Sequence, residues 1–503
     1  MSRSRVIRSV CAVLVAWGMV GAGSPAVAGT VSDPVVPFCP DPMVLAARGS
    51  GVGNTGSREY PGAAGPSTGW EGTGISRLLE RADLHGFTVS ALDLDEYPAV
   101  EAWRFDELLE SVERGRRSVV RRVGDLQRSG CQPVVIPTGY SQGAMVLNAA
   151  EHALSNSVYL PGVFYLGNPL RDGQSPRAVG SAPLLPGRAV LSQTPWEAPV
   201  PGLSVPGQDG IDYCYRNDIF CDPGGLSVQT HLSYFTDLPG EASADRAVVD
   251  AFSDWTAQAQ ERISGAGRAS VTRPVEGVLI LDTEDPVVLA DLARGASRIV
   301  REVSDSHPDA RIGIAVRRDG EVRWLVSPTR DTSELLSALL HPSGLLTGDS
   351  VAVSAPDSKL VREMITVGDA TVSVGERTFS YSLAGVSGAV LAAFETIAMA
   401  PNAVLDAPGI WFSGRTAGLT GMLSRVFTGG PVRQYLDFGD GTGAVIPADD
   451  YVEHVWQRPG TYEVTLTVTD SAGRTGTDRR WVRVYPGDGV ELSAGVGSSS
   501  GSA

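Results

Sequence analysis

The stretch VVIPTGYSQGAMVLNAA, residues 134–150, joins three local patterns in immediate succession. Residues 134–137 suit a buried strand, residues 139–143 read G-x-S-x-G, and residues 144–150 are typical of a helix. A serine in a tight turn between strand and helix is the arrangement of a hydrolase nucleophile, because flanking glycines let the two elements pack closely. A glycine-rich corner of a parallel sheet has the same local pattern, so the rest of the chain must decide the role of Ser141.

Strand and helix patterns alternate on both sides of this stretch, over residues 33–265. PMVLAARG at 42–49 and GVFYLGNP at 162–169 are strand-like, whereas residues 104–130 carry helical periodicity with a charged face. Such alternation predicts a mostly parallel sheet covered by helices on both faces.

Two further units follow. Residues 272–405 begin with the apolar strand GVLILD and predict a second α/β domain, with a hairpin turning at Asp319-Gly320 and a further strand at NAVLDAPG, 402–409. Residues 408–486 predict a small β-sandwich, because TYEVTLTVTD alternates strictly between apolar and polar side chains. Residues 487–503 read as a flexible tail.

The amino terminus predicts export. Basic residues, a short apolar run and an A-x-A site ending at Ala28 make residues 1–28 a secretory signal peptide, and no later stretch is long and apolar enough for a transmembrane segment. The net charge of −16 argues against nonspecific nucleic-acid binding. We therefore expect a secreted, extracellular protein.

Four cysteines remain after the signal peptide, namely Cys39, Cys131, Cys214 and Cys221. An even number in an exported chain predicts two disulfides, for which three connectivities exist. Cys214 and Cys221 are close enough in sequence to close one small loop, which leaves Cys39 with Cys131.

A serine nucleophile needs a histidine and an acid after it in the chain. His231 is the only suitable histidine: His152 lies on the same helix about 16 Å along it, and the others precede Ser141 or belong to later units. The acid is open among four residues that precede His231, of which Asp218 is favoured because it lies within CYRNDIFC; the other three are Asp209, Asp212 and Asp222.

These motifs together make residues 33–265 resemble the cutinases, serine esterases of the α/β-hydrolase fold. The resemblance rests on GYSQGA, on C…ND-x-x-C followed by HLSY, and on the four cysteines. It implies a three-layer sandwich, the disulfides Cys39–Cys131 and Cys214–Cys221, and the catalytic residues Ser141, Asp218 and His231. From the loop AARGSG it implies that Ser50, with Gln142, holds the oxyanion.

The two later units carry weaker resemblances. Residues 408–486, with YLDFGDG and WVRV, resemble a PKD domain, a spacer or surface-binding module; Asp440 could help to hold Ca²⁺, but a hairpin turn explains it better. Residues 272–405 resemble a von Willebrand factor A-like fold, whose D-x-S-x-S metal motif is replaced by DTEDP, residues 282–286. We therefore expect no metal and no cofactor.

The sequence thus predicts a monomeric secreted serine esterase that acts on a cutin-like polyester or on lipid esters, with the C-terminal domains binding an extracellular polymer or the cell surface. An acetylxylan esterase or a phospholipase of the same fold is the alternative within this class. A non-catalytic binding protein and a peptidase are the alternatives outside it.

Overall fold

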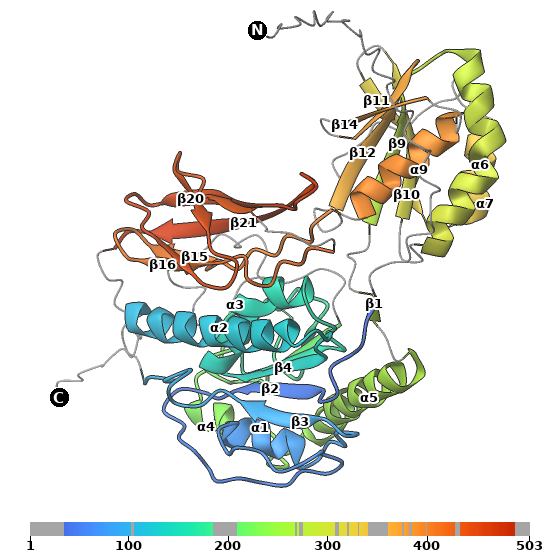
Figure 1. The fold of residues 1–503 in the computed structure, drawn as a ribbon. Helices are drawn as coiled ribbons and strands as arrows, with labels where there is room; N and C mark the ends of the chain where they lie inside the picture. The colour runs from blue at the N-terminus through green and yellow to red at the C-terminus, as the bar shows by residue number, and fades with distance from the viewer. Residues whose placement is uncertain are drawn as a thin grey trace, which may run out of the picture.

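The computed structural model describes residues 35–101, 105–184, 209–266, 269–270, 275–306, 311–318, 321–329, 331–340, 361–374, 377–381, 385–398, 400–427 and 433–487. Within them the chain forms two α/β units followed by a β-rich unit (Figure 1). The predicted signal peptide, the turn at 319–320 and residues 488–503 of the predicted tail lie outside these ranges. Among the described helices, none is both long and apolar enough to cross a membrane.

The first unit is built on a six-stranded sheet in the order β3-β2-β4-β5-β7-β6, in which all neighbouring strands are parallel. Its strands are β2 (Met43–Ala47), β3 (Thr88–Ala91), β4 (Val135–Tyr140), β5 (Val163–Leu166), β6 (Ala178–Val179) and β7 (Gly210–Tyr213). Its helices are α1 (Gly72–Leu79), α2 (Phe105–Arg128), α3 (Gln142–Ser155), α4 (Val228–His231) and α5 (Ala242–Ala266). The predicted α/β-hydrolase fold is confirmed.

The central strand β2 shows how the sheet supports three layers. All of its residues are buried, and successive side chains point to opposite faces. Met43, Leu45 and Ala47 share a hydrophobic core with α2 and α3, whereas Val44 and Ala46 share one with α1 and α5. A strand buried on both faces must be apolar throughout, which is why this segment has no polar alternation.

The second unit has a six-stranded sheet in the order β11-β10-β9-β12-β13-β14, with β9 parallel to both of its neighbours. Its strands are β9 (Val275–Leu281), β10 (Arg311–Arg318), β11 (Glu321–Thr329), β12 (Val361–Val367), β13 (Thr371–Val374) and β14 (Arg377–Ser380). Its helices are α6 (Pro286–Ser306), α7 (Thr332–Leu340) and α9 (Gly385–Ala398). A short antiparallel pair, β1 (Val35–Val36) with β8 (Ala269–Ser270), precedes this unit.

The third unit is the predicted β-sandwich, with a five-stranded sheet in the order β15-β21-β20-β17-β18 beside the pair β16-β19. The strands are β15 (Ile410–Phe412), β16 (Ala417–Leu419), β17 (Arg433–Asp437), β18 (Gly443–Ile446), β19 (Val452–His454), β20 (Gly460–Thr469) and β21 (Thr475–Tyr485). Along β20, Val464, Leu466 and Val468 are buried in the sandwich core, as the alternation predicts.

The boundary between the second and third units lies earlier in the chain than expected. The segment NAVLDAPG forms no strand of the second unit; it makes only isolated bridges, at Asn402 and Asp406. Ala403, Leu405 and Ala407 pack in the core of the sandwich instead. The expected strand of the second unit is therefore absent among the described residues of this segment, whose apolar side chains pack in the sandwich and against the first unit.

The sandwich packs on the outer face of α2 and α3 of the first unit (Figure 1). Apolar side chains of the sandwich, among them Val404, Phe412 and Met422, belong to the same hydrophobic cluster as the buried residues of α2 and α3. A hydrogen bond from Asn402 Nδ2 to the Asn156 carbonyl (3.0 Å) adds to this contact. The two units therefore share one continuous core.

Buried charges cross the same interface. Arg116 on α2 is fully buried and forms ion pairs with Glu113 and with Asp406 of the sandwich, and it donates to the Gly418 carbonyl (2.9 Å). The Tyr451 hydroxyl donates to Asp406 at 3.0 Å. A single buried guanidinium thus compensates carboxylates from two units.

Removing this guanidinium tests the interface. In Arg116→Met the two carboxylates stay buried without their cation, so the free energy of unfolding should fall by about 3–5 kcal/mol. The measurement is urea denaturation of the full chain. The matched control is Arg121→Met on the same helix, whose pair with Asp450 is exposed (55% and 65% of the side chains) and should be worth less than about 1 kcal/mol. Equal losses in both variants would contradict a special role of the buried ion pairs, because the control also breaks a contact between α2 and the sandwich, but an exposed one.

A second buried polar network lies along the edge of the first sheet. Arg177 pairs with Glu151 (2.8 Å), which also accepts from the Tyr165 hydroxyl (2.8 Å). Asn168 donates to Asp212 (2.9 Å), and burial raises the pKa of the Asp212 carboxyl to about 7, against the opposing effects of Asn168 and nearby arginines. Asp212 therefore disfavours ionisation in the folded state.

The raised pKa of Asp212 predicts a pH-dependent stability. An aspartate in the unfolded chain titrates near ~3.9, so this group favours the fold fully below about pH 4, and its contribution is lost as pH rises to about 7. Asp212→Asn keeps an acceptor for Asn168 and cannot ionise. We expect its free energy of unfolding to vary less than that of the wild type between about pH 4 and 8, by up to roughly 4 kcal/mol. The exposed control Asp41→Asn should follow the wild type in thermal melts across this range; a parallel curve for Asp212→Asn would refute the argument.

Candidate active site

Ser141 occupies a strained turn between β4 and α3. Its φ of 54° is in a region that residues other than glycine rarely adopt. Gly143 and Gly139 make the turn possible: a Cβ at Gly143 would lie 1.9 Å from the Ala47 carbonyl oxygen, and one at Gly139 would lie 2.5 Å from the Ala144 Cα. The glycines of the G-x-S-x-G motif are therefore required by the close approach of strand and helix.

His231 and Asp218 form a buried pair beside this turn. His231 Nδ1 lies 2.8 Å and 3.0 Å from the two Asp218 oxygens, and both side chains are almost inaccessible to solvent. The Ser141 N–H donates to the Leu166 carbonyl (2.8 Å), and the next residue, Gly167, packs so closely that a Cβ there would lie 2.7 Å from His231 Cε1. The end of β5 therefore brings the serine turn and the histidine together.

No hydrogen bond joins Ser141 to His231 among the described residues. Such bonds are often long without substrate and tighten only in the reacting complex. The histidine ring is held by Tyr140, which stacks on it at 4.9 Å and donates its hydroxyl to the His231 carbonyl at 2.8 Å. Tyr140 directly precedes the serine, so one strand end holds both groups.

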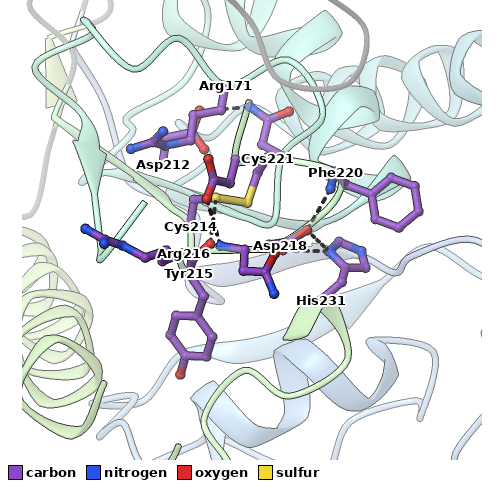
Figure 2. The surroundings of a disulfide bond; sticks show 12 residues. Arg171, Asp212, Cys214, Tyr215, Arg216, Asp218, Phe220, Cys221 and His231 are labelled. Atoms are coloured by element: carbon purple, nitrogen blue, oxygen red, sulfur yellow. Dashed lines mark hydrogen bonds and ion pairs between the residues drawn. A yellow bond between two sulfur atoms is a disulfide. The ribbon is translucent and has the colours of Figure 1, made fainter. Parts of the chain in front are cut away.

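Asp218 is fixed by its loop as well as by the histidine. Figure 2 shows it between the Cys214–Cys221 disulfide and His231. Its carboxylate also accepts from the Phe220 N–H (2.8 Å) and from the Tyr234 hydroxyl (2.6 Å). The carboxylate therefore has three donors of fixed position.

Both predicted disulfides, Cys39–Cys131 and Cys214–Cys221, are present. The second disulfide closes the loop that carries Asp218. Tyr234 contacts this loop at two points: its hydroxyl lies 3.2 Å from Cys221 Sγ and accepts from the Tyr215 N–H at 3.1 Å. Asp218 and the two sulfurs are close enough to suggest a metal site, but disulfide sulfurs offer no thiolate.

Of the four candidate acids, Asp218 contacts His231. Asp212 accepts from Asn168, and Asp222 accepts from the Asn217 N–H (2.7 Å), which shapes the acid loop. Asp209 starts the segment that leads into β7. The structure thus places beside His231 the aspartate that the disulfide loop had favoured.

Ser50 and Gln142 lie at the ends of neighbouring elements, as expected of residues at one site. Ser50 is exposed in the turn after β2, and Gln142 is the first residue of α3, where an N–H has no partner within the helix. The Gln142 side chain is buried and accepts from the Tyr97 hydroxyl (2.7 Å) and from Ser111 Oγ (3.0 Å). The Gln142 side chain is thus committed to partners within the protein.

The loop of Ser50 is held by Arg48, a residue that the sequence reasoning passed over. Its guanidinium is buried between the rings of Trp70 and Tyr97 and donates to the carbonyls of Val52 (2.6 Å), Leu92 (2.7 Å) and Tyr97 (2.7 Å). Burial lowers the pKa of this guanidinium. The A-R-G motif contained this residue, but two of its three carbonyl partners, Leu92 and Tyr97, are distant in the chain.

The two positions considered for metals are otherwise engaged. Asp282 pairs with Arg317 at 2.6 Å, so a cation already faces its carboxylate. Asp440 accepts from the Thr442 N–H (3.0 Å) and hydroxyl (2.6 Å) and contacts His454 (2.9 Å). Asp440 is thus part of the turn between β17 and β18, which agrees with the hairpin interpretation.

Comparisons with known proteins assign two of the three units. Residues 38–249 match the family model described as Cutinase, and residues 398–484 match that described as PKD domain. None of the curated proteins compared with the chain matches it.

Solved structures show similarities at low identity. The acetyl xylan esterase catalytic core of Trichoderma reesei is 16% identical (42% of this chain, 98% of the other, TM-score 0.29). A cutinase-like protein from Cryptococcus sp. is 20% identical (44% and 96%, TM-score 0.29). Carbohydrate-binding modules of a β-sandwich superfamily are 24% identical over 18% of this chain, which spans only 35% of that structure (TM-score 0.16). By the two family models, the chain carries a cutinase domain, which is a carboxylic ester hydrolase domain, and a PKD domain. Residues 250–397, between them, are covered by neither family model.

Proposed function

We propose that the protein is a secreted serine esterase that hydrolyses carboxylic ester bonds through an acyl-enzyme on Ser141. The observation that carries this proposal is the strained serine turn beside the buried His231–Asp218 pair. The disulfides support an extracellular location, because such bonds persist in oxidising compartments.

In the proposed reaction Ser141 Oγ attacks the ester carbonyl carbon while His231 Nε2 takes the hydroxyl proton. Asp218 binds Nδ1–H, which leaves Nε2 free to act as the base, and stabilises the imidazolium that forms. His231 then gives the proton to the leaving alcohol, and the acyl group stays on Ser141. Water, deprotonated by His231, attacks the acyl-enzyme, releases the carboxylic acid and restores the serine.

The negative charge on the tetrahedral intermediate needs donors that do not move during the reaction. We assign this role to the N–H groups of Gln142 and Ser50. Gln142 lies at the N-terminus of α3, where the helix dipole adds positive potential. Arg48 is a positioning residue for the Ser50 loop, since it closes the loop on the Val52 carbonyl and ties it to the carbonyls of Leu92 and Tyr97.

Exposed apolar side chains beside the histidine favour a lipid or polyester substrate. Leu226, Val228 and Leu232 are 84%, 50% and 53% exposed and surround His231 in the chain. Such a group suits contact with an apolar or bulky ester surface, which favours a cutin-like polyester or lipid ester over the acetyl groups of xylan. A panel of short-chain and long-chain nitrophenyl esters, acetylated xylan and phosphatidylcholine distinguishes esterase, acetylxylan esterase and phospholipase.

For the C-terminal domains we propose binding to an extracellular polymer or cell surface, with a von Willebrand factor A-like fold for the middle unit. The parallel strands β10, β9 and β12 at the centre of its sheet are compatible with that fold. If the protein were only a binding protein, the full chain would hydrolyse no ester while still binding a polymer. The peptidase alternative is tested separately, by measuring hydrolysis of casein.

Ser141→Ala should abolish turnover of a nitrophenyl butyrate, because it removes the only group that forms the acyl-enzyme. We expect kcat to fall by roughly 10⁴-fold or more. The control Ser264→Ala removes an exposed hydroxyl on α5 and should keep full activity. Equal kcat values for the wild type and Ser141→Ala would overturn the proposed function.

Tyr234→Phe tests the support of the acid. Burial and the neighbouring Asp218 raise the pKa of Tyr234 well above its usual range, so its hydroxyl stays protonated and donates to Asp218. A hydrogen bond to a charged group is worth ~1.5–3 kcal/mol, so kcat should fall by roughly 10-fold or more with little change in KM. Tyr165→Phe, which removes a buried hydroxyl bound to Glu151, should lower stability but leave kcat unchanged. A similar kcat for both variants would show that Tyr234 is merely structural.

A further inference from the structure

A polar cavity of about 680 Å³ lies where α2 of the hydrolase unit meets the β-sandwich. Its walls come from the middle of α2, from Asp95, and from Trp411, Arg415 and Thr416 of the sandwich. This volume is in the range of sites for small organic ligands. Because both units contribute to it, the cavity exists only when they are docked.

Four arginines line this cavity. Arg114, Arg117 and Arg121 lie three and four residues apart on α2, so they project from one side of the helix, and Arg415 faces them from the sandwich. The chain as a whole carries a net charge of −16. A concentration of guanidinium groups on such an acidic protein marks a local site for an anion.

Arg117 is held in place for such a role. Its guanidinium lies 4.4 Å from the centroid of the Tyr451 ring, and a Cβ on Gly418 would lie only 2.9 Å from its Cζ. Within the described part of the chain, its guanidinium N–H groups donate no hydrogen bond. The side chain is therefore fixed by packing, with its donors left for a ligand.

The other cations are partly committed. Arg114 donates through Nε and Nη2 to the Asp95 carbonyl (3.1 and 2.6 Å), and Arg415 pairs with Glu110 (2.5 Å). Glu113, the third carboxylate of the lining with Asp95 and Glu110, is bound at both oxygens by Arg116. Arg121 pairs with Asp450 of the sandwich. Among the described lining residues, Arg114, Arg117 and Arg415 therefore face the two remaining carboxylates, Asp95 and Glu110, which leaves a surplus of one positive charge.

We propose that this cavity binds an acidic sugar residue of a polysaccharide. A surplus of one charge matches one carboxylate, which pairs well with the edge of a guanidinium. The lining also offers the carboxylate acceptors Asp95 and Glu110 and the Thr416 hydroxyl, which suit the hydroxyl groups of a sugar. A ligand with several negative charges would face these acids unfavourably.

This binding does not depend on the proposed esterase chemistry, so the two can fail separately. The test uses the full chain with Ser141→Ala, which removes turnover, and measures binding of a linear trimer of galacturonate by isothermal titration calorimetry. We expect saturable binding that weakens as salt is raised. Xylotriose, a neutral trimer, should bind at least tenfold more weakly.

Variants locate the site. Arg117→Gln and Arg114→Gln should each weaken binding of the acidic trimer roughly tenfold, the loss of one charged hydrogen bond. Arg114 is exposed, so its variant stays informative if Arg117→Gln is unstable. The control Arg246→Gln changes an exposed arginine on α5 and should leave Kd unchanged.

Four results would overturn the proposal. Three are no detectable binding of the acidic trimer, equal affinity for xylotriose, and unchanged affinity in a well-folded Arg114→Gln; the fourth concerns the monomer. Binding of the galacturonate monomer is measured as well. Equal affinity for monomer and trimer would show that the site recognises the acid group alone and would reject a polysaccharide ligand.

Discussion

The close approach of α3 to the central sheet is the constraint on which the proposed site depends. Gly143 lies against the Ala47 carbonyl so tightly that any side chain would collide with it. The helix must therefore begin immediately after Ser141, and the serine must adopt a positive φ to connect it to β4. Closely packed side chains cover both faces of the sheet. Because this packing leaves no room for the backbone to move, the strained conformation of Ser141 persists.

The surroundings of the serine extend this rigidity outward through buried polar side chains. Tyr140 fixes the histidine, Tyr234 fixes the acid and its disulfide loop, and Arg48 fixes the loop of Ser50. Each of these side chains is buried and bonded to main-chain or charged atoms, so each would be costly to leave unpartnered. The same bonds that stabilise the fold therefore limit the positions that the reacting groups can adopt.

The parts of this structure that could be predicted from sequence are those encoded by local pattern. The G-x-S-x-G turn, the strand–helix alternation and the disulfide around Asp218 are each defined within a short stretch, and the structure has all three. Arg48 and Tyr234 could not be assigned roles, because their partners are set by the tertiary fold. Residues 402–409 were expected to form a strand of the second unit, and they pack elsewhere for the same reason: a short apolar segment does not show which core covers it.

The position of the sandwich changes how the PKD domain should be understood. A flexible spacer would present a polar surface to the hydrolase unit, but here Arg116 and Asp406 are buried at the contact and Val404 and Phe412 share a core with α2 and α3. Ionic groups are buried in an interface only when their partners are held there too, since an unpaired buried charge is strongly destabilising. The sandwich therefore covers the outer face of α2. Ser111 on this helix donates to the side chain of Gln142, the residue that follows Ser141. A ligand in the cavity between α2 and the sandwich would thus contact a helix that supports the serine turn.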